Sequence, residues 1–327
     1  MHNQNGSIKR IRSILGEIQF TSTAIISLGL IFLISLTAII CPACVTVNQM
    51  LRIAKQASVL GVAAMGQTVV MLTGGIDLSI GQVLIMSEVL AADLMAGQNA
   101  NILWVVLLLL GMAAVIGAIN GTVIALTNIP PLIMTFAMSS VIQGGYLLYT
   151  GGAPTGRAPP FLRFIGSGEI GGLFPTPLLV WFLLAGSGIF VLRRTVFGQS
   201  LYLVGSNPQA ADLSGVSVNK ITITSYVISS CAAVIAGLLL VGYVGVGTME
   251  LGQDFTLNPI AASVIGGTTF AGGHGGLLGT VGGTLIMQFL GNLLIIMRMG
   301  EPIKRIIQGI IIGGMVAFYQ WRKRESS

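Results

Sequence analysis

The stretch LMAGQNANILWVVLLLLGMAAVIGAINGTVIALTNIPPLIMTFAMSSVIQGGYLLYTGGAPTG, residues 94 to 156, decides the fold. It runs for 63 positions without an Asp, Glu, Lys or Arg. A helix needs roughly 20 mostly apolar residues to cross a hydrocarbon core about 30 Å thick. The stretch therefore predicts two membrane spans, which we expect at Leu103–Leu126 and Pro131–Tyr149.

Apolar segments of span length continue on both sides of this stretch. Only 8% of the 327 residues are charged and 54% are apolar, whereas soluble domains carry about 25% charge. This composition excludes a soluble enzyme, a nucleic-acid-binding protein and a disordered chain. The other predicted spans are Phe20–Ile40, Leu51–Thr73, Ile80–Ala96, Leu178–Leu192, Ile221–Val244, Pro259–Phe270, Gly279–Met297 and Ile303–Gln320. The eighth of the ten, Pro259–Phe270, is short enough to be a half-helix.

Basic residues mark the predicted cytoplasmic side. They gather before the first span, after the sixth and after the tenth, and cytoplasmic loops are enriched in Lys and Arg. We predict an all-α polytopic membrane protein with about ten transmembrane helices, glycine-broken or re-entrant segments, and both termini in the cytoplasm. Residues 1–327 form one transmembrane domain, with cytoplasmic segments at 1–19, 193–220 and 321–327. Seven other basic residues fall on the outer side, so nine and eleven spans stay open.

Two glycine-rich breaks interrupt the helical pattern. The first is Gly74-Gly-Ile-Asp-Leu-Ser-Ile-Gly81, and the second, Gly272-Gly273 followed by Gly279, repeats its glycine spacing. The repeated glycine spacing either arose by chance or reflects two duplicated halves of a transporter, related in parallel or inverted orientation. Asp77 in the first break could cap the next helix or contact a solute.

Glu88 is predicted near the middle of the third span. An ionisable group at that depth costs about 2.5–3.5 kcal/mol on insertion scales. It is expected either to contact a substrate or proton along an inner path, or to be a paired or protonated packing residue. Asp93 lies nearer the outer end and is expected to be solvated.

Most other glycines are predicted to let helices approach closely. Those assigned this role are Gly117, Gly121, Gly237, Gly282, Gly283, Gly313 and Gly314. The spacing of Cys41-Pro-Ala-Cys44 is also that of redox motifs, but no thioredoxin-like pattern surrounds it. We interpret both cysteines as small apolar residues at a helix end, with a redox role as the alternative.

The sequence lacks the motifs of several kinds of catalytic and binding site. No Gly-Lys dipeptide occurs, which excludes a Walker A phosphate loop. His2 and His274 are the only histidines, which argues against a histidine metal site. We therefore predict no catalytic residues, no metal, no cofactor and no nucleic-acid partner.

The segment 193–220 predicts a short exposed helix. Asn207 is a favourable N-cap, Pro208 suits the first helical position, and Gly215 suits the C-terminal stop. A short helix exposed in the cytoplasm between two spans suggests docking onto a soluble partner.

The chain resembles the permease subunits of the ribose/xylose/arabinose/autoinducer class of ABC importers, within the branched-chain permease superfamily. The motifs occur in order over roughly residues 45–320. They are the first glycine break, Ile119-Asn-Gly121 with Ile129-Pro-Pro-Leu-Ile133, Thr195-Val-Phe-Gly198, Gly205-Ser-Asn207 with Ala210-Ala-Asp-Leu-Ser-Gly215, Ala261-Ala-Ser-Val-Ile-Gly-Gly-Thr268, and Gly272-Gly-His-Gly-Gly276.

This resemblance implies a multi-pass permease of the bacterial inner membrane, surrounded by lipid. It implies a second permease copy, cytoplasmic ATPase subunits and a periplasmic solute-binding protein. Asn207, Ala210, Ala211, Asp212 and Gly215 correspond to the family's ATPase-coupling loop, with Ala210 and Ala211 expected to enter a groove on the ATPase.

The resemblance also bears on the solute and on the acidic residues. We expect a sugar, such as a pentose, to be the solute. Candidates for the translocation path are Asp77, Ser79, Glu88 and Asn120. The alternative function is an ion-coupled secondary transporter that uses Glu88 or Asp77. A membrane-embedded enzyme is remote because nucleophile and metal patterns are missing.

Overall fold

The computed structural model of the chain describes residues 26–127, 129–172, 174–300, 302–303, 305–307, 309–310 and 313–314. The start of the first predicted span, most of the tenth span and both terminal segments lie outside these residues.

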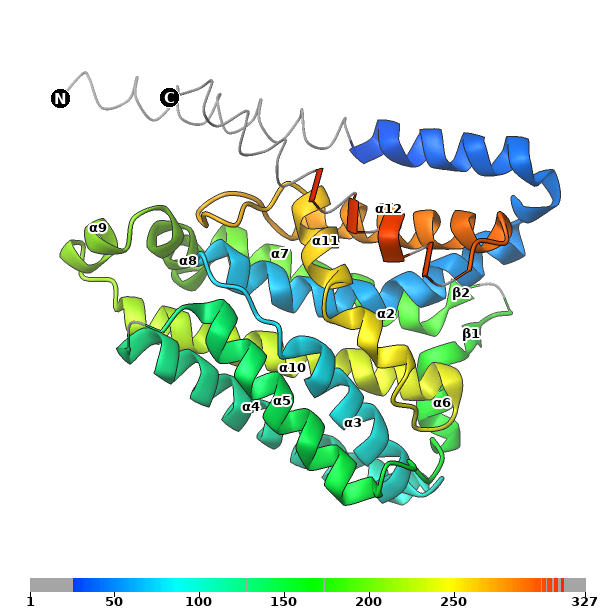
Figure 1. Cartoon of the computed structure of the whole chain (residues 1–327), viewed down its shortest axis with the longest axis horizontal. Coiled ribbons are helices and arrows are strands. Elements are labelled where there is room, and N and C mark those ends of the chain that lie inside the picture. Colours follow the sequence, from blue (N-terminus) through cyan, green and yellow to red (C-terminus); the bar gives the residue numbers. More distant parts are fainter. Residues whose placement is uncertain are drawn as a thin grey trace.

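The described chain is almost entirely helical (Figure 1). An unnumbered helix, Ile26–Ile40, comes first. The numbered elements are η1 Pro42–Cys44, α2 Val47–Leu72, α3 Ile80–Met95, η2 Asn99–Asn101, α4 Ile102–Leu126, α5 Pro131–Thr150, α6 Pro160–Ser167, β1 Glu169–Ile170, β2 Phe174–Pro175, α7 Thr176–Arg194, α8 Val196–Ser206, α9 Pro208–Leu213, α10 Val218–Val244, η3 Leu251–Phe255, α11 Asn258–Ile265 and α12 Leu277–Ile296.

The predicted all-α membrane class is confirmed. Within the described residues, five helices are long and apolar enough to cross a membrane. They are Asn99–Leu126, Pro131–Thr150, Thr176–Arg194, Val218–Val244 and Leu277–Ile296. The helix α2 is also long, with 26 residues, but it is less apolar because it contains several charged and amide side chains. The total of ten spans and the position of the termini stay predictions.

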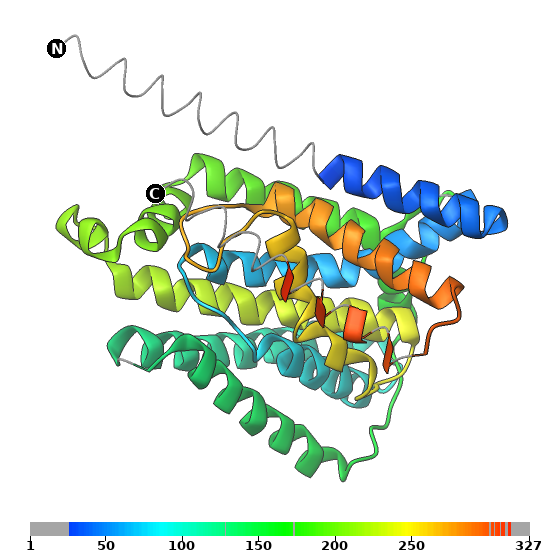
Figure 2. The same ribbon diagram turned by 45° about the horizontal axis from the view of Figure 1, so that its top comes forward.

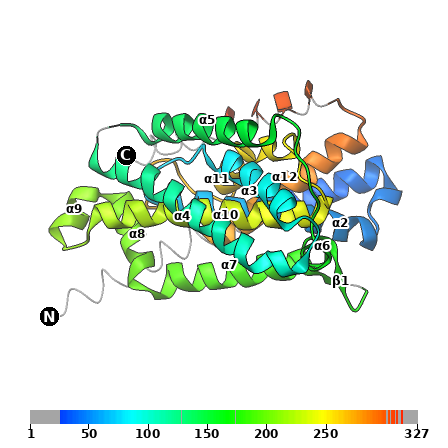
Figure 3. The same ribbon diagram turned by 90° about the horizontal axis from the view of Figure 1, so that it is seen from below.

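The core surrounds α2 and α10. Every residue of α2 from Ala57 to Leu72 is buried, and α10 packs against α2, α3 and α4. At the crossing with α4, a Cβ added to Gly117 or Gly121 would lie 2.6 Å from the α10 backbone. The predicted packing role of these two glycines is therefore confirmed. Figure 3 shows α5 at the margin of the bundle, near α3 and α4.

The other glycines assigned to helix packing behave in two ways. Gly237, Gly282 and Gly283 also sit against neighbouring chain atoms. Gly313 and Gly314 face open space among the described residues. The packing role of these two positions stays a prediction, because much of the chain around them lies outside the described residues.

Two helices that lie at predicted spans, α3 and α11, are too short to cross a membrane in the usual way. The helix α3 has 16 residues, and α11 has 8 residues. A helix needs roughly 20 residues to cross the hydrocarbon core of a bilayer. Each of the two follows a stretch without α-helix. Residues 74–79 precede α3, and residues 245–257, which include the short 3-10 helix η3, precede α11. The half-helix interpretation of the eighth segment is confirmed.

The two ends of the bundle differ (Figure 1). One end carries α8 and α9, and the other carries α6 and the β1–β2 hairpin, in which Ile170 pairs with Phe174. Residues 150–177 thus contain a helix and a hairpin, although this segment is rich in Pro and Gly. Helix Ile26–Ile40 lies beside α12 (Figure 2), where Ile26 contacts the Gly282 position.

Candidate functional site

The first glycine break crosses the interior of the bundle as extended chain. It leaves α2 through Gly74, whose φ of +81° favours glycine. A Cβ on Gly75 would lie 2.5 Å from the Tyr226 hydroxyl of α10, so the close packing there requires glycine. Asp77 and Ser79 follow, and both are completely buried.

Asp77 is the centre of a hydrogen-bond network. Its Oδ1 accepts from the Ser79 backbone N–H at 2.9 Å and from the Ser79 hydroxyl at 2.6 Å. Its Oδ2 accepts from the Ser229 hydroxyl of α10 at 2.7 Å. Both carboxylate oxygens are therefore occupied by protein groups. Asp77 is not the N-cap residue of α3, which is Ser79, but its carboxylate binds the backbone N–H of that residue.

Neighbouring helices complete the network. Asn120 of α4 donates from Nδ2 to the Ser79 hydroxyl at 3.0 Å. The Thr135 hydroxyl of α5 accepts from the Leu78 N–H at 3.0 Å. With its nitrogen turned toward the carbonyl of Asp77, the Gln67 side chain of α2 donates to that oxygen at 2.9 Å. The break is thus held by α2, α4, α5 and α10 together.

Of the four path candidates, the structure unites Asp77, Ser79 and Asn120 and places Glu88 elsewhere. Sequence reasoning missed Gln67, Thr135 and Ser229, which hold the same break. In the sequence, each of these three residues is recognisable only as a polar side chain within an apolar span. Several other residues fit the same description, so the sequence alone could not single these three out.

Glu88 lies more than two turns further along α3 and is also completely buried. Its Oε1 accepts from the Thr248 N–H at 3.0 Å and from the Thr248 hydroxyl at 2.8 Å. Its Oε2 has no partner in the described part of the chain. Glu88 thereby satisfies a backbone group of the irregular segment 245–257. This segment runs antiparallel along α3, so that Gly252 contacts Ile85.

The second glycine break touches the first. The Gly273 N–H donates to the carbonyl of Leu72, the last residue of α2, at 3.0 Å. A Cβ added to Gly272 would lie 2.8 Å from the Gly74 nitrogen and 2.9 Å from the Gly205 oxygen of α8. The two breaks that echo each other in sequence therefore meet in space, and the end of α8 completes the junction. We call Leu72–Gly75, Gly205 and Gly272–Gly273 the glycine junction.

The short helix α9 extends from this junction. The Asn207 side chain accepts from the Ala210 N–H at 3.0 Å, and Pro208 occupies the first turn. At the other end, Gly215 has a φ of +79° and donates to Asp212, while Val216 donates to Ala211. This pair of bonds is a Schellman motif. The predicted helix and both of its capping residues are confirmed.

The exposure of α9 differs from the expectation for a partner groove. Ala211 is 0% exposed because it packs inside the chain, and Ala210 is half-buried. Ala211 is thus covered by its own chain here, and the expected entry of Ala210 and Ala211 into a groove on the ATPase stays a prediction. Leu213 is 90% exposed instead, and Gln209 and Asp212 flank it on the surface.

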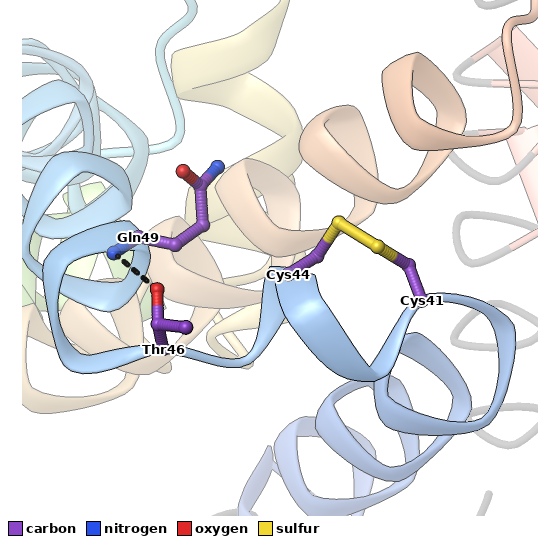
Figure 4. The surroundings of a disulfide bond; sticks show 4 residues. All are labelled: Cys41, Cys44, Thr46 and Gln49. Carbon is purple, nitrogen blue, oxygen red and sulfur yellow. Dashed lines mark hydrogen bonds between the residues drawn. A yellow bond between two sulfur atoms is a disulfide. The ribbon is translucent and has the colours of Figure 1, made fainter.

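Cys41 and Cys44 form a disulfide (Figure 4). They are three positions apart, and the single turn of η1 brings their Cα atoms to 5.3 Å, within the range that a disulfide needs. Their interpretation as two unpaired apolar residues is therefore wrong. In the described residues, no group of three or more His, Cys, Asp or Glu side chains could hold a metal ion.

The chain is similar in sequence to known permease proteins. Residues 49–316 match the family model described as branched-chain amino acid transport system / permease component. The chain is 32% identical to the ribose import permease protein of Escherichia coli K12, covering 87% of this chain and 89% of that protein. It is 32% identical to the fructose import permease protein of Rhizobium meliloti, covering 84% and 78%.

A third relative is named for a solute other than ribose or fructose. The chain is 30% identical to the autoinducer 2 import system permease protein of Escherichia coli SMS-3-5, covering 84% of this chain and 79% of that protein. No solved structure matches the chain.

Proposed function

This chain belongs to the family of branched-chain amino acid transport system permease components and is an integral inner-membrane protein, and from that premise we propose that it is the membrane-spanning subunit of an ATP-driven ABC importer for a sugar. As in its family, ATP hydrolysis belongs to a separate subunit, so this chain is not itself an enzyme.

The connection between α9 and the glycine junction carries this proposal. The exposed helix is capped at both ends, and α8 joins it to the junction through Gly205. A displacement of α9 by a cytoplasmic ATPase would therefore be transmitted to α2 and to the break before α3. In this proposal, Asn207 and Gly215 shape the coupling helix, Ala210 and Ala211 seat it on its own chain, and Leu213 beside Asp212 contacts the ATPase.

A second permease copy is proposed to pack against α5. The exposed face of this helix carries Ser140 and Gln143 among apolar residues. Polar side chains in contact with hydrocarbon are unfavourable, and in membrane proteins they usually face other helices or water. A facing copy of α5 supplies both a partner and a polar path between the two subunits, while lipid covers the remaining apolar faces.

The solute is proposed to be a small sugar such as a pentose. The two relatives named for a sugar are import permeases for ribose and fructose. A periplasmic binding protein would deliver the sugar to the end that carries α6 and the hairpin, opposite α9. Asp77, Ser79, Asn120 and Glu88 are assigned to the scaffold of the path in this proposal, because none is exposed.

Reconstitution tests the function. The chain is placed in liposomes alone, or with the ATPase and periplasmic binding protein of its own transport system, and uptake of radiolabelled ribose is measured. We expect uptake only in the complete assembly with ATP, and none with a non-hydrolysable ATP analogue. Uptake by the chain alone on a proton or sodium gradient would establish the secondary-transporter alternative and refute the proposal.

A further inference from the structure

The disulfide between Cys41 and Cys44 is the feature that the transport function does not use. It lies between helix Ile26–Ile40 and α2, at the end of the bundle that carries the hairpin (Figure 1). The salt bridge of 2.8 Å between Lys55 of α2 and Glu169 of β1 connects this end of α2 to the hairpin. We propose that Cys41-Pro-Ala-Cys44 is a reversible thiol–disulfide exchange site that faces the outer compartment.

The size of the covalent loop argues against a purely structural bond. A disulfide stabilises a fold chiefly by constraining the unfolded chain, and this effect grows with the number of residues enclosed. Here the two cysteines are separated by three positions. The turn they enclose is already closed by backbone bonds, from the Cys44 N–H to the Cys41 oxygen at 2.9 Å and from the Val45 N–H to the Pro42 oxygen at 3.3 Å.

Accessibility favours exchange. Both cysteines are half-buried and the intervening Pro42 is exposed, so an external thiol can reach the bond. Disulfides that solvent can reach are reduced more readily than buried structural disulfides. Cys231 on α10 is half-buried and free, so it is replaced in the experiments below to leave only this pair.

The proposed reaction is balanced by an external thiol such as glutathione. A thiolate attacks one sulfur of the pair, the Cys41–Cys44 bond breaks, and the second sulfur leaves as a thiolate. Another external thiol then resolves the mixed disulfide. Two external thiols are oxidised to one disulfide, and their two electrons and two protons reduce the pair to two thiols.

Redox titration of the full chain tests this inference. The Cys231→Ser chain in lipid nanodiscs is equilibrated with mixtures of reduced and oxidised glutathione, quenched in acid, and alkylated. Intact-mass spectrometry then counts the labels. We expect no label in oxidising mixtures and two labels, gained together, in reducing ones. A pair that stays closed in every glutathione mixture and opens only with excess dithiothreitol would be a permanent clip and would overturn the proposal.

Single substitutions give an independent measurement. In Cys41→Ser or Cys44→Ser, each made in the Cys231→Ser chain as is the double variant, exchange with oxidised glutathione should leave a mixed disulfide, since no resolving cysteine remains. The Cys41→Ser/Cys44→Ser double variant is the matched control and should gain no adduct. Absence of an adduct from both single variants would also refute the inference.

The outward orientation of the site rests on the proposed function, and in-cell labelling tests it. A membrane-impermeant reductant followed by a membrane-impermeant maleimide should label the pair in intact cells. Labelling only after lysis would refute the outer location.

Uptake separates the two proposals. We expect the double cysteine variant to keep ATP-driven uptake in the complete assembly. A failed titration would then leave the transport function intact, whereas failed uptake by the native assembly would contradict the transport function.

Discussion

At the scale of single residues, the absence of a side chain decides the arrangement at the glycine junction. A Cβ on Gly205 would lie 1.9 Å from the Leu72 carbonyl oxygen and 2.5 Å from the Gly273 nitrogen. Both neighbours are backbone atoms and cannot turn aside. The close contact of three chain segments therefore depends on this one position.

Gly205→Ala should destabilise the junction, because overpacking a rigid contact costs about 1–3 kcal/mol. We expect a lower thermal unfolding midpoint in detergent and weaker coupling of ATP hydrolysis to uptake. Gly186→Ala in α7 is the matched control, since a Cβ there meets no atom within 4 Å. Equal unfolding midpoints for the two variants would contradict the assigned contact.

Asp77 acts through hydrogen bonding in this structure. In Asp77→Asn, the remaining oxygen can still accept from Ser79, and the new amide can donate to the Ser229 hydroxyl. We expect Asp77→Asn to keep ATP-driven uptake and Asp77→Ala to lose stability, by about 1–3 kcal/mol for each buried group left without a partner. Loss of uptake in Asp77→Asn at an unchanged unfolding midpoint would instead indicate that transport needs the charge.

At the scale of elements, the broken helices place polar groups inside the membrane protein. Extended or irregular backbone at membrane depth has to be satisfied by the protein itself. The break before α3 is satisfied by Thr135 and Gln67, and the segment before α11 is partly satisfied by Glu88. The buried acids therefore support irregular backbone, which explains their presence in a chain with so few charges.

The helix α9 presents one apolar side chain to solvent. Leu213→Asp should abolish ATP-dependent uptake and weaken copurification of the ATPase while leaving the unfolding midpoint unchanged, because Leu213 has few contacts within the chain. Leu213→Met is the control that keeps an apolar side chain. Ala211→Asp should instead lower the unfolding midpoint, because Ala211 is fully buried. The proposed contact would be refuted if Leu213→Asp still bound and coupled the ATPase normally.

At the scale of the whole molecule, the two ends are chemically distinct. Arg193 and Arg194 end α7 immediately before α8, at the end of the bundle that carries α9. Cytoplasmic loops are enriched in such residues. The opposite end carries the amphipathic helix α6 and the hairpin. That end carries basic residues of its own, Lys55 beside the hairpin and Arg163 in α6, so the orientation with α9 toward the cytoplasm stays a prediction.

Cysteine labelling measures that orientation. In a background of Cys41→Ser, Cys44→Ser and Cys231→Ser, a membrane-impermeant maleimide should label Ile170→Cys of β1 in intact cells. Gln209→Cys of α9 should react only after permeabilisation. The reverse pattern would invert the proposed topology and remove the coupling role of α9.

Much of the secondary structure followed from the sequence alone. The uncharged stretch from residue 94 to residue 156 predicted α4 and α5, because a helix of about 20 apolar residues satisfies its own backbone in lipid. Asn207 and Gly215 predicted both ends of α9, because capping is local chemistry. The motifs and their order along the chain indicated the family without any knowledge of the fold.

Only the tertiary structure decided what the buried polar residues do. Asp77 and Ser229 are separated by 152 positions, and no local pattern connects them. The burial of Ala211, the exposure of Leu213 and the meeting of Gly74 with Gly272 likewise depend on how distant helices pack. Local periodicity and capping determine where helices begin and end, whereas contacts between distant segments depend on packing, and packing determined the scaffold of this permease.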